Sequence, residues 1–392
     1  MSVYIGSFPT IALFLTITAG TWASNFVRFA YHISALFAGV YLASSAVAQN
    51  NILPVSVQLN AAAIQPERGF SGVIGAAFLP DGHIVVGDAG KSAIHRFDAN
   101  GKYLGSVGRR GKGPGEFEDL NWLVSCSDGS VLAFDASLYR INVFDQRGVF
   151  KTSFVPPTWF QFDSVLSCDE PRTAVLLQKN PRAKPAQRGR SVIYPAAIVK
   201  IKWAEKGLDT LITLSGSEFF FAKVRGYVDL PLGQRAIAAA SGGYIAAGVS
   251  NETALLFFRP NGKPADTLTI NGLRKRTSAI DWQKAKIDRL KLLHEKGAYE
   301  RVRQVLEEAE PPTTLPLFDA IFVDRFTASA WIRLFTNSQR AEWIRLNPSA
   351  SGRKRFLLPE NVEVIAVSAE KLLGLQRSED GNEQLILFTF TR

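Results

Sequence analysis

The chain repeats itself at a fixed interval, and this repeat restricts the folds open to it more than composition does. A group of turn and strand residues recurs 47 residues further along the chain. The pairs are Asp81 and Asp128, Asp88 and Asp135, Phe97 and Phe144, and Gly101 and Gly148. A third, weaker copy ends at Asn261 and Gly262, 161 residues after Asn100 and Gly101. The body of the chain is therefore an array of similar units.

Each unit reads as four short strands separated by tight turns. In the first unit the strand segments are GAAFLP, HIVVGD, AIHRFD and YLGSVG, and two turns contain Asp81-Gly82 and Asn100-Gly101. Asp-Gly and Asn-Gly pairs favour hairpins because both residues tolerate positive φ. Four antiparallel strands form one blade of a β-propeller. A single blade leaves both of its apolar faces uncovered, so the blades must stack and close into a ring.

Counting the weaker copies predicts an all-β fold, a six-bladed β-propeller of four-stranded antiparallel blades. Blades one to five cover about residues 73–108, 120–154, 160–214, 235–270 and 318–358. The sixth unit contains only three strands, and ILPVSVQLN at residues 52–60 lies ahead of blade one without a partner. Because an unpaired blade edge is a liability, we expect this N-terminal strand to complete the sixth blade and close the ring.

A polar, charged segment at about residues 277–310 breaks the strand pattern between blades four and five. Ser278 and Asp281 resemble a helix N-cap with an acidic first turn. Apolar residues then follow helical spacing, Gly297 interrupts them, and Pro311 ends the second run. The segment therefore predicts a helical hairpin. It either packs on the rim of the propeller or forms a lid over one mouth of the central channel.

Two segments of the repeat resemble NHL-like propeller sequences. DASLYRINVFDQRG at residues 135–148 looks like an NHL repeat, and GRRGKGPGEF resembles the link between two such blades. Trp331 on the second strand of a late blade and the helical insertion are similar to exported bacterial six-bladed propellers of this group. The resemblance covers about residues 52–392. It implies the fold more than an activity, because fold does not determine function.

The N-terminus carries an export signal. Arg28 precedes an apolar run at residues 33–47, and Ala46 and Ala48 form an A-x-A pattern, which predicts cleavage after Ala48. We therefore expect a signal peptide at residues 1–48 and a single propeller domain at residues 49–392. An additional apolar stretch at residues 11–23 suggests that the true start of the signal peptide lies downstream of Met1. The mature protein should be periplasmic or secreted. An uncleaved membrane anchor is the alternative, because the same apolar residues could supply one span of about 20 residues.

The segment GRRGKGPGEFEDLNWL at residues 108–123 combines glycines with basic residues. It does not match a Walker phosphate loop, which requires Lys where Pro114 stands. On the repeat it connects blade one to blade two, which predicts a structural link anchored by Phe117. The net charge of +10 nevertheless leaves an anionic partner open. The candidates for that contact are Arg109, Arg110 and Lys112.

Asp88 and Asp135 occupy the same position at the end of the second strand in two blades. They could belong to a ring of carboxylates that binds cations or basic groups. Alternatively, each could hold a turn by accepting nearby backbone N–H groups, which repetition at the blade period favours. Arg140 precedes the third strand of blade two, and we expect it to be an ion partner of a neighbouring loop rather than a ligand residue.

The chain contains two cysteines, Cys126 and Cys168, each at the end of the first strand of a blade. An even number of cysteines in an exported protein suggests a disulfide. Equivalent positions in adjacent blades should nevertheless lie further apart than the roughly 7 Å that a disulfide allows between Cα atoms. A disulfide and two buried thiols therefore both remain open.

Common catalytic signatures are absent from the sequence. There is no G-x-S-x-G nucleophile elbow and no H-E-x-x-H zinc pair, and within the blades the histidines are His83 and His95. A three-histidine zinc site, as in some propeller lyases, therefore lacks ligands. We predict no cofactor, while a divalent cation bound by oxygen ligands at the axis stays open.

Two functions from different classes fit these observations. The first is an exported recognition or scaffold module for a protein, peptide or glycan partner in the cell envelope. The second is a hydrolase or lyase with its site in the axial channel, dependent on a divalent metal. We expect no nucleic-acid partner, because the basic clusters lack interleaved aromatic residues for base stacking. We also expect a monomer, with no membrane span left after signal cleavage.

Overall fold

A computed structural model describes most of the chain after residue 54 and places residues Leu53–Arg392 in one compact unit. The described residues are 55–56, 59–156, 164–170, 173–179, 188–203, 208–223, 226–241, 244–259, 261–270, 274–291, 293, 296–335, 340–347, 350–359, 361–378 and 380–390. The predicted signal peptide, residues 1–48, lies outside them. Within them, no helix is long and apolar enough to cross a membrane.

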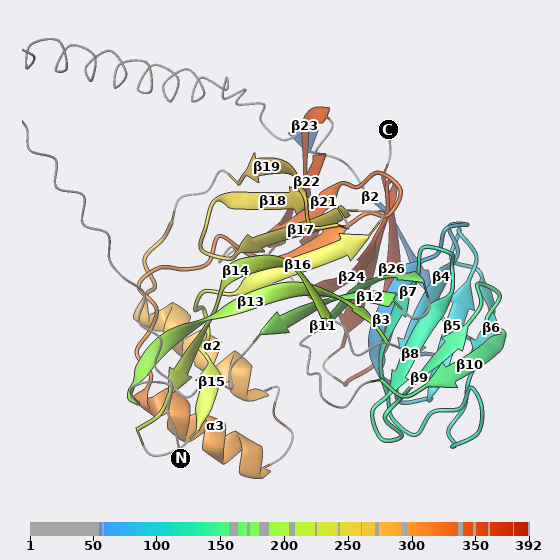
Figure 1. The fold of residues 1–392 in the computed structure, drawn as a ribbon, viewed down its shortest axis with the longest axis horizontal. Helices are drawn as coiled ribbons and strands as arrows, with labels where there is room; N and C mark the ends of the chain where they lie inside the picture. Colours follow the sequence, from blue (N-terminus) through green and yellow to red (C-terminus); the bar gives the residue numbers. More distant parts are fainter. Residues whose placement is uncertain are drawn as a thin grey trace, which may run out of the picture. The chain divides into compact units, whose positions relative to one another are not determined.

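Six sheets, antiparallel except where the short β1 (Val55–Ser56) joins blade five in parallel, confirm the predicted six-bladed β-propeller (Figure 1). Blade one contains β3 (Val73–Phe78), β4 (Ile84–Asp88), β5 (Ala93–Phe97) and β6 (Tyr103–Val107). Blade two contains β7 (Leu120–Ser125), β8 (Val131–Asp135), β9 (Arg140–Phe144) and β10 (Phe150–Phe154). Blade three contains β11 (Ser164–Glu170), β12 (Thr173–Lys179), β13 (Arg190–Lys202) and β14 (Leu208–Phe221), extended by β15 (Tyr227–Asp229).

The second half of the ring follows the same order. Blade four contains β16 (Ala236–Ser241), β17 (Tyr244–Val249), β18 (Ala254–Phe258) and β19 (Pro264–Thr269). Blade five contains β20 (Phe318–Val323), β21 (Ala330–Leu334), β22 (Arg340–Asn347) and β23 (Ala350–Pro359). Blade six contains β24 (Val362–Val367), β25 (Lys371–Arg377) and β26 (Glu383–Phe390), completed by β2 (Leu59–Ile64).

The repeated turns have the geometry that their residue types favour. Gly101 and Gly148 adopt φ values of +85° and +81°, a conformation that costs glycine little. Three residues before each glycine stands an aspartate, Asp98 or Asp145, whose carboxylate accepts backbone N–H groups of the turn. Asp98 Oδ1 accepts N–H groups from Asn100 and Lys102 at 2.8 and 2.9 Å. Local side-chain chemistry therefore sets the third turn of each of these two blades.

A strand near the N-terminus closes the ring, as predicted, but it begins later in the chain than the predicted segment, residues 52–60. β2 pairs with β26 in antiparallel register from Leu59 opposite Phe390 to Ile64 opposite Leu385. Part of the predicted closing segment, β1 (Val55–Ser56), instead pairs in parallel with β23 of blade five. The strand propensity of VSV therefore did not locate the closing strand, because pairing and burial outweigh intrinsic propensity in a sheet.

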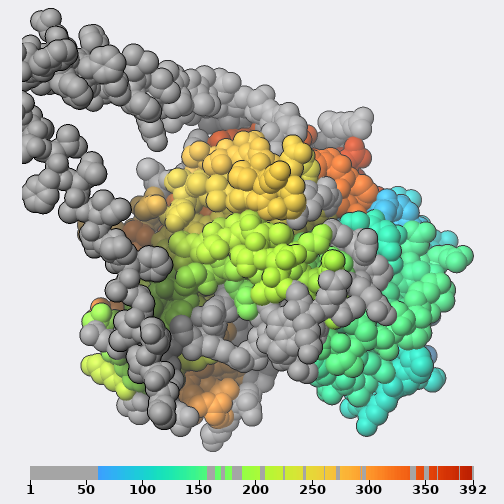
Figure 2. All heavy atoms as spheres, viewed as in Figure 1, coloured from blue at the N-terminus to red at the C-terminus, as the bar shows by residue number. Residues whose placement is uncertain are grey.

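The core consists of apolar layers between neighbouring blades. Blades three and four, for example, lie side by side (Figure 2) and bury Leu177 and Ile198 against Ile245 and Phe258. Each fully buried aliphatic side chain contributes about 1.5–3 kcal/mol. Alternate residues of each strand face opposite neighbours, so every blade shares its two faces with two interblade layers.

The helical insertion forms the predicted hairpin of α2 (Ala279–Lys291) and α3 (Lys296–Glu308) between blades four and five. Asp281 N donates to Ser278 Oγ at 3.1 Å, which caps α2. Trp282 and Val305 pack against Phe220 and Val228 on the extended hairpin of blade three. Neither helix contributes a described residue to the lining of the axial cavity, and their packing on blade three agrees with the rim alternative.

Candidate functional site

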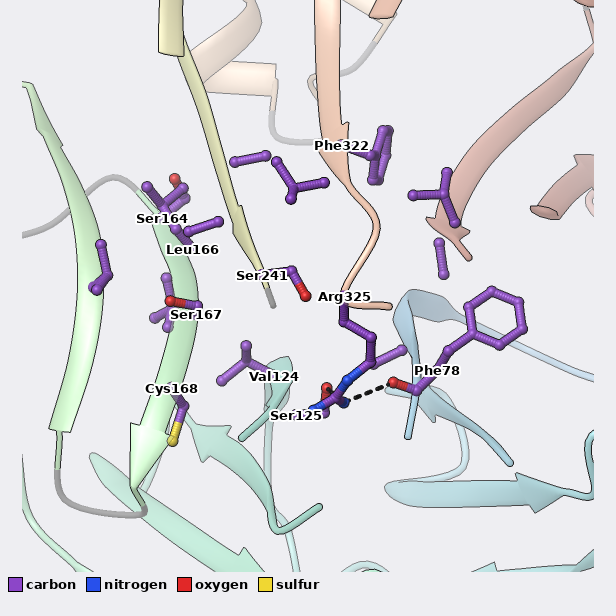
Figure 3. A pocket seen from close by; sticks show the side chains of 18 of the residues that line it. Phe78, Val124, Ser125, Ser164, Leu166, Ser167, Cys168, Ser241, Phe322 and Arg325 are labelled. Carbon is purple, nitrogen blue, oxygen red and sulfur yellow. Dashed lines mark hydrogen bonds between the residues drawn. The ribbon is translucent and has the colours of Figure 1, made fainter. Parts of the chain in front are cut away.

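The innermost strands of all six blades surround a cavity of about 350 Å³ (Figure 3). These strands are β3, β7, β11, β16, β20 and β24. Each is the terminal strand of its sheet, so among the described residues one edge of its backbone pairs with no further strand, apart from a single parallel bridge between Cys168 of β11 and Cys126. Unpaired N–H and C=O groups are therefore available around the cavity.

Small and hydroxyl-bearing side chains line this cavity. Alanines from β3 and β16 leave room along its wall, and five serines add hydroxyl groups that both donate and accept hydrogen bonds. The serines are Ser125, Ser127, Ser164, Ser167 and Ser241. Phe78, Phe322 and Tyr244 supply aromatic surface. The described lining thus combines apolar faces with neutral hydrogen-bonding groups.

Arg325 is the one charged side chain among the described residues that line the cavity. It follows β20 of blade five and reaches across to blades one and two, where Nη1 donates to Phe78 O at 3.0 Å (Figure 3). Nη1 also donates to Ser125 Oγ at 3.2 Å, and Nη2 donates to Cys126 O at 3.0 Å. Arg325 therefore joins three blades at the end of the channel where their first strands end.

Burial lowers the pKa of Arg325, although the nearby carboxylates Asp81, Asp128 and Asp324 favour its charged form. An arginine remains protonated in proteins despite such shifts. Because its donors bind protein carbonyl and hydroxyl oxygens and three carboxylates lie close, its charge is largely compensated within the protein. Apart from this one arginine, the described residues that line the cavity are uncharged.

Cys126 and Cys168 form a disulfide at the same end of the channel. Their Cα atoms lie 4.3 Å apart, so the larger separation expected from the ring was wrong. The reason is local: both residues lie at the ends of innermost strands, where a parallel bridge joins the two, and Ser127 N donates to Cys168 O at 2.9 Å. The two strands thus come closer than the average blade spacing.

Asp88 and Asp135 are fully buried and lie away from the described cavity lining. Asp88 accepts N–H groups from Ser71 and Lys91 at 3.1 and 3.2 Å. Asp135 accepts three backbone N–H groups, from Glu118, Asp119 and Leu138. Because both carboxylates are enclosed and engaged with backbone, they do not form an exposed ring of acidic groups. This geometry matches the turn-holding alternative.

The predicted basic residues lie together in the link between blades one and two, but outside the cavity. Arg109 Nε donates to Glu116 Oε1 at 2.7 Å, and Gly113 N donates to Glu116 Oε2 at 2.8 Å. These contacts hold the pKa of Glu116 below its ordinary value, the Gly113 N–H most strongly. Arg110 and Lys112 share this loop, and both side chains lie at its surface.

Arg140 holds this link in place. Its Nη1 donates to Lys112 O at 2.9 Å, and Nη2 donates to Gly113 O and Glu116 O at 2.6 and 2.9 Å. The predicted contact with a neighbouring loop is therefore made to backbone carbonyls rather than to a carboxylate. Phe117 at the end of the link is fully buried and packs against Phe144. This burial fits the predicted role of Phe117 in anchoring the link between the two blades.

The described residues bring no cluster of three or more His, Cys, Asp or Glu side chains together in a form that could hold a metal ion. At a turn, His83 Nδ1 lies 3.1 Å from Asp81 Oδ2. Nε2 of the buried His95 lies 3.4 Å from Asp88 Oδ2. Neither histidine is among the described residues that line the cavity.

Arg325 is the site residue that sequence reasoning missed. In blades one and two the first turn reads Asp81-Gly82 and Asp128-Gly129, whereas blade five reads Asp324-Arg325-Phe326-Thr327. This departure from the turn pattern was the available signal. At this turn a long cationic side chain stands where blades one and two have glycine.

The fold and the cavity together define a six-bladed β-propeller with a polar axial cavity. A model of the DUF5128 family, described as a 6-bladed beta-propeller, matches residues 74–153, which span blades one and two. No curated protein matches the chain in sequence.

Several solved structures are similar to this chain. A DUF4221 family member from Bacteroides vulgatus ATCC 8482 is 12% identical with a TM-score of 0.50, covering 86% of this chain and 98% of that one. A protein from Bacteroides fragilis NCTC 9343, described as exported, is 11% identical with a TM-score of 0.47 over 86% and 99% of the two chains. An inactive virginiamycin B lyase from Staphylococcus aureus is 10% identical with a TM-score of 0.41 over 85% and 100%. At 12% identity, the likeness to the DUF4221 family member shows the fold alone.

Proposed function

We propose that the protein is an exported recognition module that binds an uncharged polar ligand, a glycan end in preference to a peptide, in its axial cavity. The observation that supports this most is the lining itself. Serine hydroxyls and free strand edges offer both donors and acceptors, while alanines and aromatic rings offer apolar faces. A sugar ring presents the same combination of hydroxyl groups and apolar C–H faces. The volume of about 350 Å³ lies at the lower end of the roughly 300–1,000 Å³ typical of ligand sites.

The enzyme alternative receives less support from the described residues. General acid–base catalysis needs a positioned group such as histidine or a carboxylate within reach of the substrate. None of the described lining residues is Asp, Glu, His or Lys, and Arg325 is occupied by protein oxygens. The lining therefore favours binding over proton transfer.

The binding proposal can be tested by filling the cavity. Ala239 lines it on β16, so the larger side chain of Ala239→Leu should narrow the cavity, whereas Ala62→Leu at an exposed position of β2 makes the same change elsewhere. Saturation-transfer NMR would screen a panel of neutral oligosaccharides and short peptides against the parent protein. We expect binding of an oligosaccharide by the parent and by Ala62→Leu, and none by folded Ala239→Leu. Equal binding by all three proteins, or turnover of a panel member, would refute the proposal.

Export is a separate part of this proposal. The leader pattern at residues 1–48 supports transfer across the inner membrane with cleavage after Ala48, and we propose a monomer thereafter. Mass spectrometry of the protein recovered from the periplasm should give an N-terminus at Gln49. Recovery of the uncleaved chain in the membrane fraction would favour the anchor instead.

A further inference from the structure

The outward face of α2 combines apolar and basic side chains. Ile280, Lys284, Ile287 and Lys291 are exposed, and their spacing places them on one stripe of the helix, here called the α2 surface. Ile280 is 81% exposed and Ile287 is 52% exposed. Trp282, on another face of the helix, is buried in the apolar cluster with α3 and blade three. The fold thus uses one face of α2 and leaves a second apolar stripe in solvent.

The segment that carries this stripe is strongly basic. Residues 274–291 contain seven basic residues and two acidic ones. The basic residues are Arg274, Lys275, Arg276, Lys284, Lys286, Arg289 and Lys291. Of the two acidic residues, Asp281 accepts a hydrogen bond from Ser278 Oγ through Oδ2 at the helix N-terminus. Asp288 Oδ1 lies 3.6 Å from Lys291 Nζ. The segment that carries the exposed isoleucines therefore has a net positive charge, which favours anionic partners.

We propose that the α2 surface binds the surface of an anionic lipid bilayer. Isoleucine side chains can enter the acyl boundary while lysines extend to the headgroups, the arrangement of helices that lie in a membrane interface. Juxtaposed lysines and arginines are attracted to anionic lipids. The chain's own N-terminal apolar segment matches less well, since residues 1–48 contain Arg28 and no acidic residue to complement the lysines. This membrane contact is independent of the axial cavity.

Vesicle co-sedimentation tests the proposal with the full chain and with residues 53–392, which contain all six blades. Both should bind phosphatidylglycerol-containing vesicles, and residues 53–392 should not bind pure phosphatidylcholine vesicles. Lys284→Gln/Lys291→Gln should weaken the binding to anionic vesicles by about tenfold or more. Ile280→Ser/Ile287→Ser should cause a comparable loss, and added salt should weaken binding by the parent.

A matched control separates this surface from general stickiness. Ile193 and Leu357 are 49% and 46% exposed on other elements, so Ile193→Ser/Leu357→Ser removes two exposed apolar side chains elsewhere on the surface. We expect this variant to bind anionic vesicles as the parent does. The proposal is overturned if residues 53–392 do not bind anionic vesicles, if they bind both vesicle types equally, or if the two α2 double variants bind as well as the parent. Circular dichroism would confirm that each variant is folded.

Discussion

The disulfide between Cys126 and Cys168 joins the innermost strands of consecutive blades, and both residues are buried beside the axial cavity. The carbonyl of Cys126 also accepts a hydrogen bond from Arg325, which comes from blade five. One end of the channel is therefore held by a covalent bond between blades two and three and by an arginine that links blade five to blades one and two. Interactions across the axis supplement the packing between adjacent blades.

Loss of the disulfide should destabilise the propeller. Cys126→Ala/Cys168→Ala removes a crosslink between residues 42 positions apart, which frees the unfolded chain. We expect the free energy of unfolding to fall by about 2–4 kcal/mol in urea titrations. Reductant should lower the stability of the parent toward that of the double variant and leave the double variant unchanged. A double variant as stable as the parent would contradict this role.

Removal of the Arg325 side chain should also destabilise the fold. In Arg325→Met, the oxygens of Phe78, Ser125 and Cys126 lose their donors, so we expect a loss of about 2–3 kcal/mol in urea unfolding. Arg325→Lys should recover part of this loss, because an ammonium group cannot reproduce the planar fork of donors. Arg109, whose side chain is 82% exposed, provides the control. Arg109→Met should change the stability by less than about 0.5 kcal/mol, and an equal loss in both methionine variants would be evidence against the cross-axis role.

The fold was predictable because local chemistry repeats along the sequence. Asp-Gly and Asn-Gly turns mark where strands end, and their recurrence in the sequence defines the blades without information on long-range contacts. The closing strand was harder to locate. LNAAAI has weaker strand propensity than the VSV segment before it, yet Ile64 is the residue buried against blades one and six. Selection between the two segments depends on burial that exists only once the ring is closed.

The site was less predictable for the same reason. Arg325 and Phe78 are 247 residues apart in sequence, and their contact follows from ring closure rather than from a motif. Asp88, Asp135 and Arg140 were visible as repeated or charged positions, but their partners are backbone groups that no side-chain pattern reveals. Polar residues with conspicuous spacing therefore organise turns here, whereas the cavity is lined largely by serines and alanines that carry no distinct pattern.

The link between blades one and two should tolerate loss of its exposed charges. The triple variant Arg109→Ala/Arg110→Ala/Lys112→Ala should melt near the parent's temperature, because exposed ion pairs contribute about 0–1 kcal/mol. Arg140→Ala should be clearly less stable, by about 1–3 kcal/mol, because three backbone carbonyls lose a charged donor. Differential scanning calorimetry would compare the two proteins. The reverse order of stability would show that the exposed cations, and not Arg140, hold the link.

Asp88 should make stability depend on acid pH. Burial acts to raise the pKa of Asp88, but His95 and the N–H groups of Ser71 and Lys91 together hold this pKa below its ordinary value of 3.8. The resulting stabilisation is complete above the unfolded pKa and is lost as pH falls through the lower folded pKa. Urea unfolding of the parent should therefore show a decline below about pH 4. Asp88→Asn should be less stable at neutral pH and should lose less stability over the acid range. An unchanged acid slope in this variant would exclude the carboxylate as a source.

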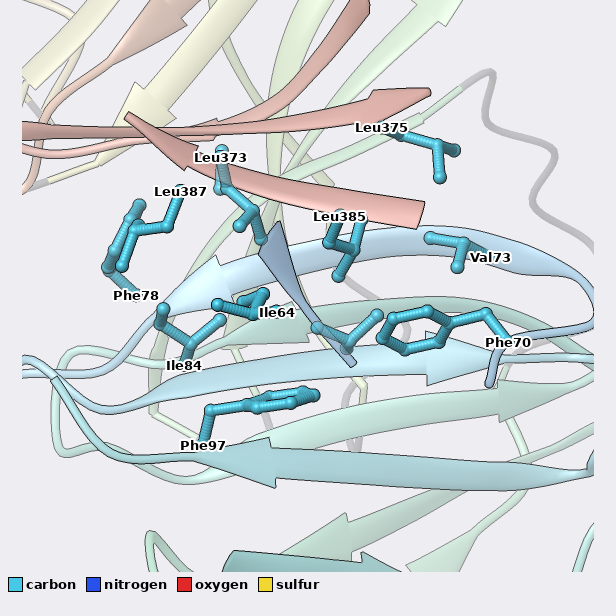
Figure 4. Packing of buried hydrophobic residues seen from close by; sticks show 12 residues of the cluster. Ile64, Phe70, Val73, Phe78, Ile84, Phe97, Leu373, Leu375, Leu385 and Leu387 are labelled. Atoms are coloured by element: carbon cyan, nitrogen blue, oxygen red, sulfur yellow. The ribbon is translucent and has the colours of Figure 1, made fainter. Parts of the chain in front are cut away.

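Ring closure can be tested at Gly101, which lies against the closing strand. Gly101 and Gly381 adopt φ values of +85° and +79°, so alanine should cost each about 1–2 kcal/mol. A Cβ at Gly381 meets no atom within 4 Å, whereas one at Gly101 overlaps Ile64 Cγ2. Ile64 lies in the layer between blades one and six, near Phe78 and Leu385 (Figure 4).

Gly101→Ala should therefore be less stable than Gly381→Ala by a further amount of about 1–3 kcal/mol, measured by urea unfolding. In an Ile64→Ala background the overlap disappears, so the cost of Gly101→Ala should fall to that of Gly381→Ala. A cost that stays the same in both backgrounds would place the strain in the turn alone. The predicted coupling instead ties the third turn of blade one to the strand that joins the two ends of the chain in one sheet, because both occupy the same layer of the core.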